Sequence, residues 1–222
     1  MKLYAGNVAS LLRRFDKLAV NMADTLANRF GEQTVSSLLP QTRQVFEQLI
    51  PTIPDVGGRP PFTLFVNSTA MFLALYRAMQ EHGYSLEETG VVIYEMTQSY
   101  IDDIPPVQKR FISQLMFSRI FLARARHRAR RSQASMLPET FIYRFVEGRR
   151  AEYNYGIDYT QCAIVKFLKK HDALELAPYI CKLDVIYSGA FDWGLKRTQT
   201  IASGADHCDF RFRKGNTTEV KQ

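Results

Sequence analysis

The chain has 222 residues, 46% of them hydrophobic and 23% charged, and it carries a formal net charge of +7. This length and composition predict one sizeable globular domain with at most a helical appendage, and they exclude a low-complexity chain. The low and odd number of cysteines, three, excludes a secreted disulfide framework. We find no signal peptide and no apolar run of about 18 residues, so we expect a cytoplasmic protein without a membrane partner.

The first half of the chain is predicted to be helical. Apolar residues at helical spacing indicate a first helix over residues 8–26, and a second is expected over 41–50. Four prolines and two glycines then exclude regular helix in residues 51–62. This loop is either a plain helix–helix connector, which we favour, or a segment whose backbone approaches a ligand at Gly57 and Gly58.

Three further helices follow. The first covers residues 64–82 and is strongly apolar. Ser85, with Glu88 three residues later, forms a capping-box pattern that marks the start of the next helix. The prolines at 105–106 end that helix, and one long helix is expected over 107–132.

The end of this long helix carries a basic run, with five arginines between Arg124 and Arg131. Runs of this kind bind nucleic acid or anionic lipid in some proteins. Here no aromatic residues are interleaved with the arginines, and no known nucleic-acid motif surrounds them. We therefore interpret the run as a solvated helix face whose charge stabilises the helix C-terminus, and a nucleic-acid partner is not favoured.

After Pro138 the pattern becomes alternating. Four strands are expected, over residues 139–147, 150–157, 195–202 and 207–212. Two helices separate the second strand from the third, one over 158–172 with Asp158 as its N-cap and one over 174–188. This order predicts an α+β fold, in which a helical N-terminal half is followed by a small antiparallel sheet of about four strands packed against helices.

Three units are expected along the chain: a helical extension over residues 1–40, a single α+β domain over 41–215 and a flexible tail over 216–222. The apolar first helix can pack on its own domain or on a second copy of the chain. Of the two, we favour a homodimer.

The three cysteines, Cys162, Cys181 and Cys208, lie in the last third of the chain. Cys162 is expected near a helix N-terminus, where the helix dipole lowers a thiol pKa. The simpler interpretation of each cysteine is a small buried hydrophobic residue. His207 and Cys208 point to opposite faces of a strand, and no paired ligand spacing occurs. We expect no cofactor, with zinc bound by the three cysteines as the remaining alternative.

Acids lie close to the cysteines in sequence. Asp184 follows Cys181 by three residues and shares its helix face. The last strand places Cys208 and two phenylalanines on one face, and Asp209 and Arg211 on the other. Asp209 and Arg211 either form an ordinary surface pair or border a site.

Segments of the C-terminal third resemble the L-2-amino-thiazoline-4-carboxylic acid hydrolase family. These segments are residues 158–184 and 196–212, with weaker agreement upstream as far as Leu49. The distinctive feature is a set of residues in a fixed order: Asp158, Cys162, Cys181, Asp184, Arg197, Thr198, Thr200, Cys208, Asp209, Phe210, Arg211 and Phe212.

The resemblance implies hydrolysis of a small cyclic amidine or isothiourea carboxylate, by cleavage of a C–N or C–S bond on a route towards cysteine. The residues it implies as catalytic are Cys162, Cys181, Asp184 and Cys208. A cysteine nucleophile and a carboxylate that activates water both remain open. The residues it implies as substrate-binding are Asp158, Arg197, Thr198, Asp209 and Arg211. Among these, Arg197 or Arg211 would hold the substrate carboxylate.

The predicted layout is also similar to small-molecule-binding domains related to the four-vinyl-reductase module. The shared features are a helical start, an antiparallel sheet and a late cysteine near a glycine. This second resemblance implies a ligand-binding or sensory domain without catalysis, because likeness of fold does not decide function. A small-molecule partner is expected on either interpretation.

Overall fold

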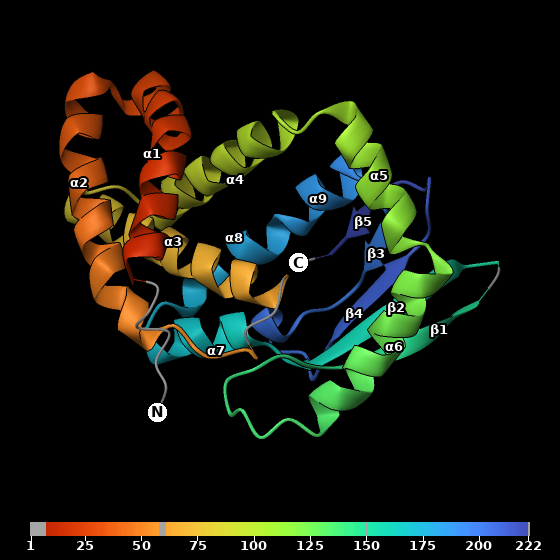
Figure 1. Cartoon of the computed structure of the whole chain (residues 1–222). Coiled ribbons are helices and arrows are strands. Elements are labelled where there is room, and N and C mark those ends of the chain that lie inside the picture. The colour runs from red at the N-terminus through yellow and green to blue at the C-terminus, as the bar shows by residue number, and fades with distance from the viewer. Residues whose placement is uncertain (1–7, 58–60, 150, 222) are drawn as a thin grey trace.

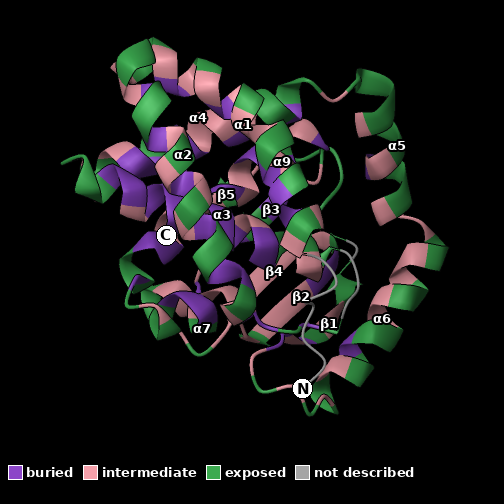
Figure 2. Cartoon of the chain, turned by 60° about the vertical axis from the view of Figure 1, so that its left-hand side comes forward, coloured by how far each residue is buried: buried purple, intermediate pink, exposed green. Residues whose placement is uncertain are grey.

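Helices and strands occupy different parts of the molecule (Figure 1). The computed structural model describes residues 8–57, 61–149 and 151–221. Helices lie beside and over a five-stranded sheet that the second half of the chain forms. Buried residues concentrate where the helices meet one another and the sheet (Figure 2). The α+β class predicted from the sequence is confirmed.

Four long helices build the first half of the chain: α1 (Val8–Phe30), α2 (Glu32–Leu49), α3 (Phe62–Glu81) and α4 (Leu86–Asp102). Phe15 of α1 and Phe46 of α2 are fully buried, and their rings stack with centroids 5.6 Å apart. The same hydrophobic cluster includes Phe167 from the second half of the chain. The first helix therefore shares its core with the elements that carry the sheet.

α2 begins at Glu32, although the sequence predicted a start near residue 41, and Pro40 lies inside it. Proline lacks an N–H group and usually breaks a helix interior. Here Val35 and Leu38 before the proline and Phe46 after it are all buried on one side of the helix. Tertiary packing of this apolar face outweighs the local cost of the proline. A short 3-10 turn (Ile50–Thr52) then leads into the proline-rich loop.

α3 is the central helix of this half. It is the one helix of the described residues that is long and apolar enough to cross a membrane by length and composition alone, which the sequence analysis did not expect. However, 61% of its most apolar stretch is buried inside the structure, as is usual for a core helix. The capping box of α4 is confirmed, since Ser85 Oγ accepts from Glu88 N and Glu88 Oε2 accepts from Ser85 N at 2.7 Å.

The predicted long helix over 107–132 is wrong, because two helices replace it. They are α5 (Pro106–Met116) and α6 (Arg119–Gln133). Ser118 lies between them in an extended conformation, and its side chain accepts a hydrogen bond from Phe121 N at 3.2 Å. This serine is therefore the N-cap of α6, a role that favours serine over continued helix.

The sheet contains β1 (Ile142–Arg149), β2 (Tyr153–Gln161), β3 (Leu195–Arg197), β4 (Cys208–Phe212) and β5 (Glu219–Val220) in the order β1-β2-β4-β3-β5. All neighbouring strands are antiparallel except β3 and β5, which are parallel. The four predicted strands are present, although β3 is shorter than expected and a 3-10 turn (Ile201–Ser203) follows it. Residues 219–220, expected within a flexible tail, form the fifth strand.

Short helices connect β2 to β3. They are α7 (Ala163–Lys170), a 3-10 turn (Leu174–Leu176), α8 (Ala177–Lys182) and α9 (Asp184–Ala190). The prediction that Asp158 is the N-cap of α7 is wrong. β2 continues to Gln161, and Cys162 holds the N-cap position of α7. The end of β2 pairs with β1 on one side and with β4 on the other, so its backbone is held in the sheet and cannot begin the helix.

Candidate active site

An ion pair between Asp184 and Arg197 joins the helices to the sheet. Asp184 begins α9 and Arg197 ends β3. Arg197 Nη1 donates to the carboxylate of Asp184 and to the backbone oxygen of Cys181 at 3.2 Å. The side chain of Arg197 is only 1% exposed, whereas that of Asp184 is 32% exposed. The arginine is therefore enclosed by protein, and one side of the aspartate is open.

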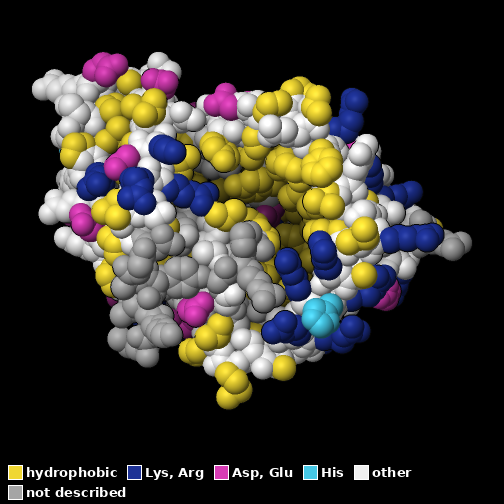
Figure 3. Space-filling model, in the orientation of Figure 1, with side chains coloured by type: hydrophobic (Ala, Val, Ile, Leu, Met, Phe, Trp, Pro, Cys, Tyr) yellow, Lys and Arg dark blue, Asp and Glu magenta, His cyan; other side chains and the backbone are white. Residues whose placement is uncertain are grey.

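The environment of Asp184 changes its acidity. Burial among protein atoms raises its pKa to about 6, although the charge and hydrogen bond of Arg197 act in the opposite direction. Figure 3 shows a hollow lined mainly by hydrophobic side chains, with acidic atoms visible in its depth. A carboxyl group that is partly open and titrates near neutrality is suited to accept a proton from water.

The three cysteines gather around this carboxylate from three elements. Cys162 precedes α7, Cys181 lies in α8 and Cys208 begins β4. The negative charge of Asp184 acts on all three thiols. The structure thus places all of the residues predicted as catalytic close to one another and to Arg197.

The thiols are not acidic. Burial raises the pKa of Cys162 to about 12, although the backbone N–H groups of Val165 and Ile164 lower it. The expectation of an acidic thiol at this helix terminus is therefore wrong, because desolvation of the thiolate outweighs the helix. Burial likewise raises the pKa values of Cys181 and Cys208. Within the described part of the chain, no group of three or more His, Cys, Asp or Glu side chains is arranged to hold a metal ion.

Tyrosines and phenylalanines wall the site, and the sequence analysis did not single them out. Tyr159 lies opposite Cys208 in the β2–β4 register. Its ring packs against Phe210, Tyr143 and Phe62 with centroid distances of 5.3, 5.4 and 6.3 Å. Burial raises its pKa far above the usual value, and the charges of Tyr143, Asp184 and Cys162 add to this effect. The alternation of Tyr155, Ile157 and Tyr159 along β2 was the available sequence signal.

The remaining predicted residues lie on the other face of the sheet. Arg211 donates to Asp158 Oδ1 at 2.7 Å, and this pair crosses Gly156, where a Cβ atom would lie 2.8 Å from the arginine side chain. Asp209 accepts from the backbone N–H groups of Thr198 and Gln199 at 2.8 and 2.9 Å and from the Thr198 hydroxyl. These contacts engage the carboxylates of Asp158 and Asp209 with protein donors.

Asp209 is held as a carboxylate. Burial alone would raise its pKa, but the hydrogen bonds from Thr198 and Gln199 outweigh burial and lower it. Side chains alternate along a strand, so Asp209 points away from Cys208 and from Arg197. The substrate-binding residues expected at one site are thus divided, with Arg197 on the inner face and Asp158, Thr198, Asp209 and Arg211 on the outer face.

The sequence model of one protein family, described as L-2-amino-thiazoline-4-carboxylic acid hydrolase, matches residues 65–212. The chain belongs to this family. The resemblance inferred from the sequence is confirmed. No curated protein sequence and no solved structure matches the chain.

The family match covers every residue that was predicted as catalytic or substrate-binding. Residues 65–212 run from the first turn of α3 to the end of β4, and they include all three cysteines, Asp184 and Arg197. α1, α2 and β5 lie outside the match, although the first two helices share the hydrophobic core. The family assignment gives a hydrolase-like function.

Proposed function

We propose that the chain hydrolyses a small cyclic amidine or isothiourea carboxylate, and that Asp184 is its general base. The family assignment supports the reaction class. The single observation that carries the catalytic assignment is the partly open Asp184 carboxylate, which has a pKa of about 6 and is paired with the enclosed Arg197. At pH 7 most of this carboxylate is ionised and ready to accept a proton.

The reaction would add water to the amidine carbon of the substrate. Asp184 takes one proton from water as the oxygen forms its bond to the carbon of the protonated amidine. The C–S or C–N bond then breaks, Asp184 returns its proton to the leaving sulfur or nitrogen, and the new hydroxyl group loses its remaining proton to solvent as the carbonyl forms. No group outside the protein, the substrate and water is required. Arg197 holds the carboxylate in position through Nη1, and its charge limits the rise of the Asp184 pKa.

The raised thiol pKa values favour this route over attack by a cysteine. A thiol must lose its proton to become a good nucleophile, and burial opposes this loss at Cys162, Cys181 and Cys208. We therefore assign the cysteines to the lining of the site, where they act as small apolar groups.

The structure also bears on how the substrate carboxylate is held. Arg197 is enclosed and paired with Asp184, and Arg211 is paired with Asp158 on the opposite face. A guanidinium that is already paired with a protein carboxylate is a weak candidate for a second anion. We therefore propose that the substrate carboxylate is held by other residues.

The test is incubation of the purified protein with aminothiazoline carboxylate, with detection of carbamoyl-cysteine or of free thiol. We expect turnover by the unmodified protein and a loss of about 10²- to 10⁴-fold in kcat for Asp184→Asn. Asp192→Asn is the matched control, because Asp192 is exposed and its left-handed backbone (φ 56°) suits asparagine equally well. Full turnover by Asp184→Asn would contradict the assignment of the base.

The alternative is a ligand-binding or sensory domain without chemistry, and the apolar lining of the hollow in Figure 3 is the observation that favours it. This alternative predicts no product from any cyclic amidine carboxylate, together with a small molecule retained through purification. Mass spectrometry of the denatured protein would detect such a molecule.

A further inference from the structure

A cavity of about 430 Å³ lies between α6, Val56 and Gly57, the start of α3 and the segment that leads into β1. Its volume falls in the range of about 300–1,000 Å³ that is typical of small-molecule sites. Its lining combines two kinds of side chain. The basic ones are Arg124, His127, Arg128 and Arg131, and the apolar ones include Val56, Phe62, Phe141 and Tyr143.

Three arginines of α6 face this cavity because of their helical spacing. Arg124, Arg128 and Arg131 follow at intervals of four and three residues, which places them on one side of the helix. The two other arginines of the run do not line the cavity: Arg126 pairs with Glu147 at 2.6 Å, and Arg130 lies elsewhere on α6.

The cavity-facing arginines have no acidic partner among the residues that the structure describes. Like charges at this spacing repel one another and destabilise an isolated helix. A bound anion would remove that repulsion. Guanidinium groups are also suited to carboxylates, because they present several donors in a planar fork.

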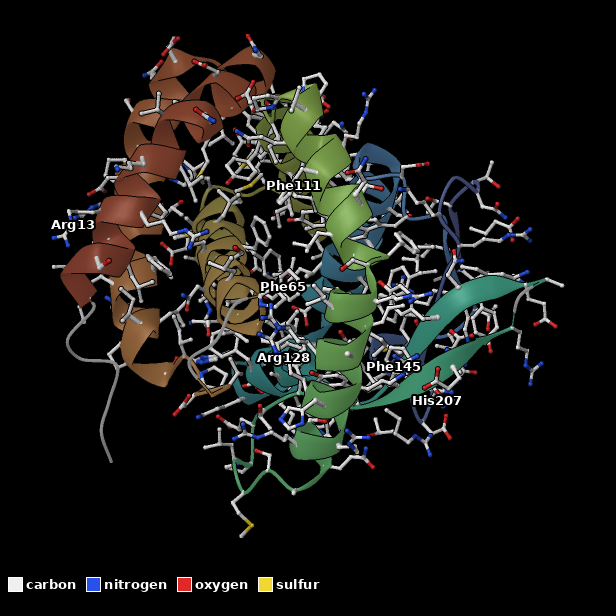
Figure 4. The ribbon with its side chains drawn as sticks, turned by 45° about the vertical axis from the view of Figure 1, so that its right-hand side comes forward. Arg13, Phe65, Phe111, Arg128, Phe145 and His207 are labelled. Carbon is white, nitrogen blue, oxygen red and sulfur yellow. The ribbon has the colours of Figure 1, made fainter. Side chains whose placement is uncertain are left out.

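Exposed apolar side chains of α3 and α5 lie near the arginine-lined cavity. Phe65 of α3 is 40% exposed and Phe111 of α5 is 64% exposed. Figure 4 shows that Phe65, Phe111 and Arg128 all lie in the space between α3 and the α5–α6 pair. In Figure 3 basic side chains border the hydrophobic hollow along one side. A ligand that satisfies both surfaces has an anionic end and an apolar body.

This cavity adjoins the candidate active site through an aromatic wall. Tyr143 and Phe62 line the cavity, and both rings pack on Tyr159, which borders Asp184 and Cys162. The cavity and the candidate active site thus lie on either side of the same aromatic rings.

We propose that Arg124, Arg128 and Arg131 form the binding site for the carboxylate of an organic anion that has an apolar body. As an assignment of the substrate class, this rests on the proposed hydrolase function. As an assignment of an anion site, it stands on the cavity, its three arginines and its aromatic wall. The site takes the role that Arg197 and Arg211, both already paired, do not fill.

The test uses isothermal titration calorimetry on the full chain with 4-phenylbutyrate. Its uncharged amide, 4-phenylbutyramide, has the same body and tests whether the charge is recognised. We expect the amide to bind at least tenfold more weakly, and the acid to bind at least tenfold more weakly to Arg128→Gln and to the double variant Arg124→Gln/Arg128→Gln. Arg130→Gln, on the same helix, is the matched control and should retain the affinity of the unmodified protein.

Equal affinity for the acid and the amide, an equal loss in Arg130→Gln, or no binding at millimolar concentration would overturn the proposal. The variant Asp184→Asn separates it from the hydrolase proposal, because it should bind 4-phenylbutyrate unchanged while turnover of aminothiazoline carboxylate is lost. Arginine-dependent binding by a protein that hydrolyses nothing would remove the hydrolase function and leave the anion site. Turnover of aminothiazoline carboxylate without arginine-dependent binding of 4-phenylbutyrate would remove the anion site and leave the hydrolase function.

Discussion

Arg197 Nη1 bonds both the carboxylate of Asp184 and the backbone oxygen of Cys181, so one enclosed guanidinium fixes the junction between α8 and α9 against the sheet. Its Nε and Nη2 have no partner among the described protein groups, and the ring of Phe210 lies 5.4 Å from the guanidinium carbon. The residue therefore depends on Asp184 for charge compensation.

The activity of the protein should depend on the ionisation of Asp184. Because its pKa is raised to about 6, the active carboxylate form disappears as the pH falls through 6, and kcat/KM should decrease about tenfold per pH unit below that value. A pH–rate profile between pH 4.5 and 8 measures this. A flat profile in that range would exclude Asp184 as the base.

The stability of the fold should change in the opposite direction over the same range. The folded protein binds the Asp184 proton more tightly than the unfolded chain, whose aspartates titrate near pH 3.9. The stability contributed by this group is thus fully present below about pH 4 and is lost as pH rises through 6. The difference in unfolding free energy between the unmodified protein and Asp184→Asn, followed by urea titration at several pH values, isolates this effect.

Removing Arg197 should destabilise the protein more than removing an exposed neighbour. Arg197→Met leaves Asp184 without its counter-charge, and we expect a loss of about 2–4 kcal/mol in unfolding free energy, less than for a fully enclosed pair because Asp184 is 32% exposed. Lys196→Met is the control, since Lys196 is 63% exposed and its pair with Glu219 spans 3.5 Å. That pair should contribute less than about 1 kcal/mol. Similar losses for both variants would contradict the inference that Asp184 depends on Arg197 for its counter-charge.

The cysteines should be dispensable for turnover. Cys162→Ser and Cys181→Ser remove the thiols whose pKa values burial raises, and we expect each variant to keep kcat within about threefold, a range far smaller than the loss of a nucleophile. Slow labelling of the folded protein by iodoacetamide at pH 7.5 is the companion measurement. A loss of more than a hundredfold in either variant, with the fold intact, would restore the thiol mechanism.

Asp209 should be a structural residue of the outer face. Asp209→Asn weakens the hydrogen bonds that hold Thr198 and Gln199 after β3, so we expect a loss of about 1–2 kcal/mol in unfolding free energy. The kcat of the folded fraction should not change, because this side chain points away from Asp184. A lower kcat without a loss of stability would show that Asp209 acts in the active site and is not a structural residue.

Local sequence signals predicted much of the fold. The Ser85–Glu88 capping box acts within four residues, and its geometry is confirmed. The alternation in residues 208–212 likewise gave the correct two faces of β4. Features decided by distant packing were missed. The break at Ser118 follows from capping, and the passage of α2 through Pro40 depends on burial against other helices.

The candidate site could be predicted only in part. The family pattern identified the cysteines, Asp184 and Arg197, and these residues do converge. It also grouped Asp158, Asp209 and Arg211 with them. Alternation along the last strand separated Asp209 and Arg211 from Cys208, but it could not show which face of the sheet borders the other predicted residues. The register that pairs Asp158 with Asp209 and Tyr159 with Cys208 places Asp158 on the outer face, and it depends on contacts about 50 residues apart. Tyr159 and Phe62 were missed for the same reason.

The position of β3 in the sheet determines when the site can form during synthesis. The strand that carries Arg197 is flanked by β4 and β5, and Lys221 N donates to Arg197 O at 2.9 Å. Both flanking strands follow Arg197 in the chain, whereas α1 to α4 pack largely on one another. A growing chain can therefore assemble its helical core while the ribosome still holds residues 208–221. The pair of Asp184 and Arg197 can reach its enclosed state only after those last residues have emerged.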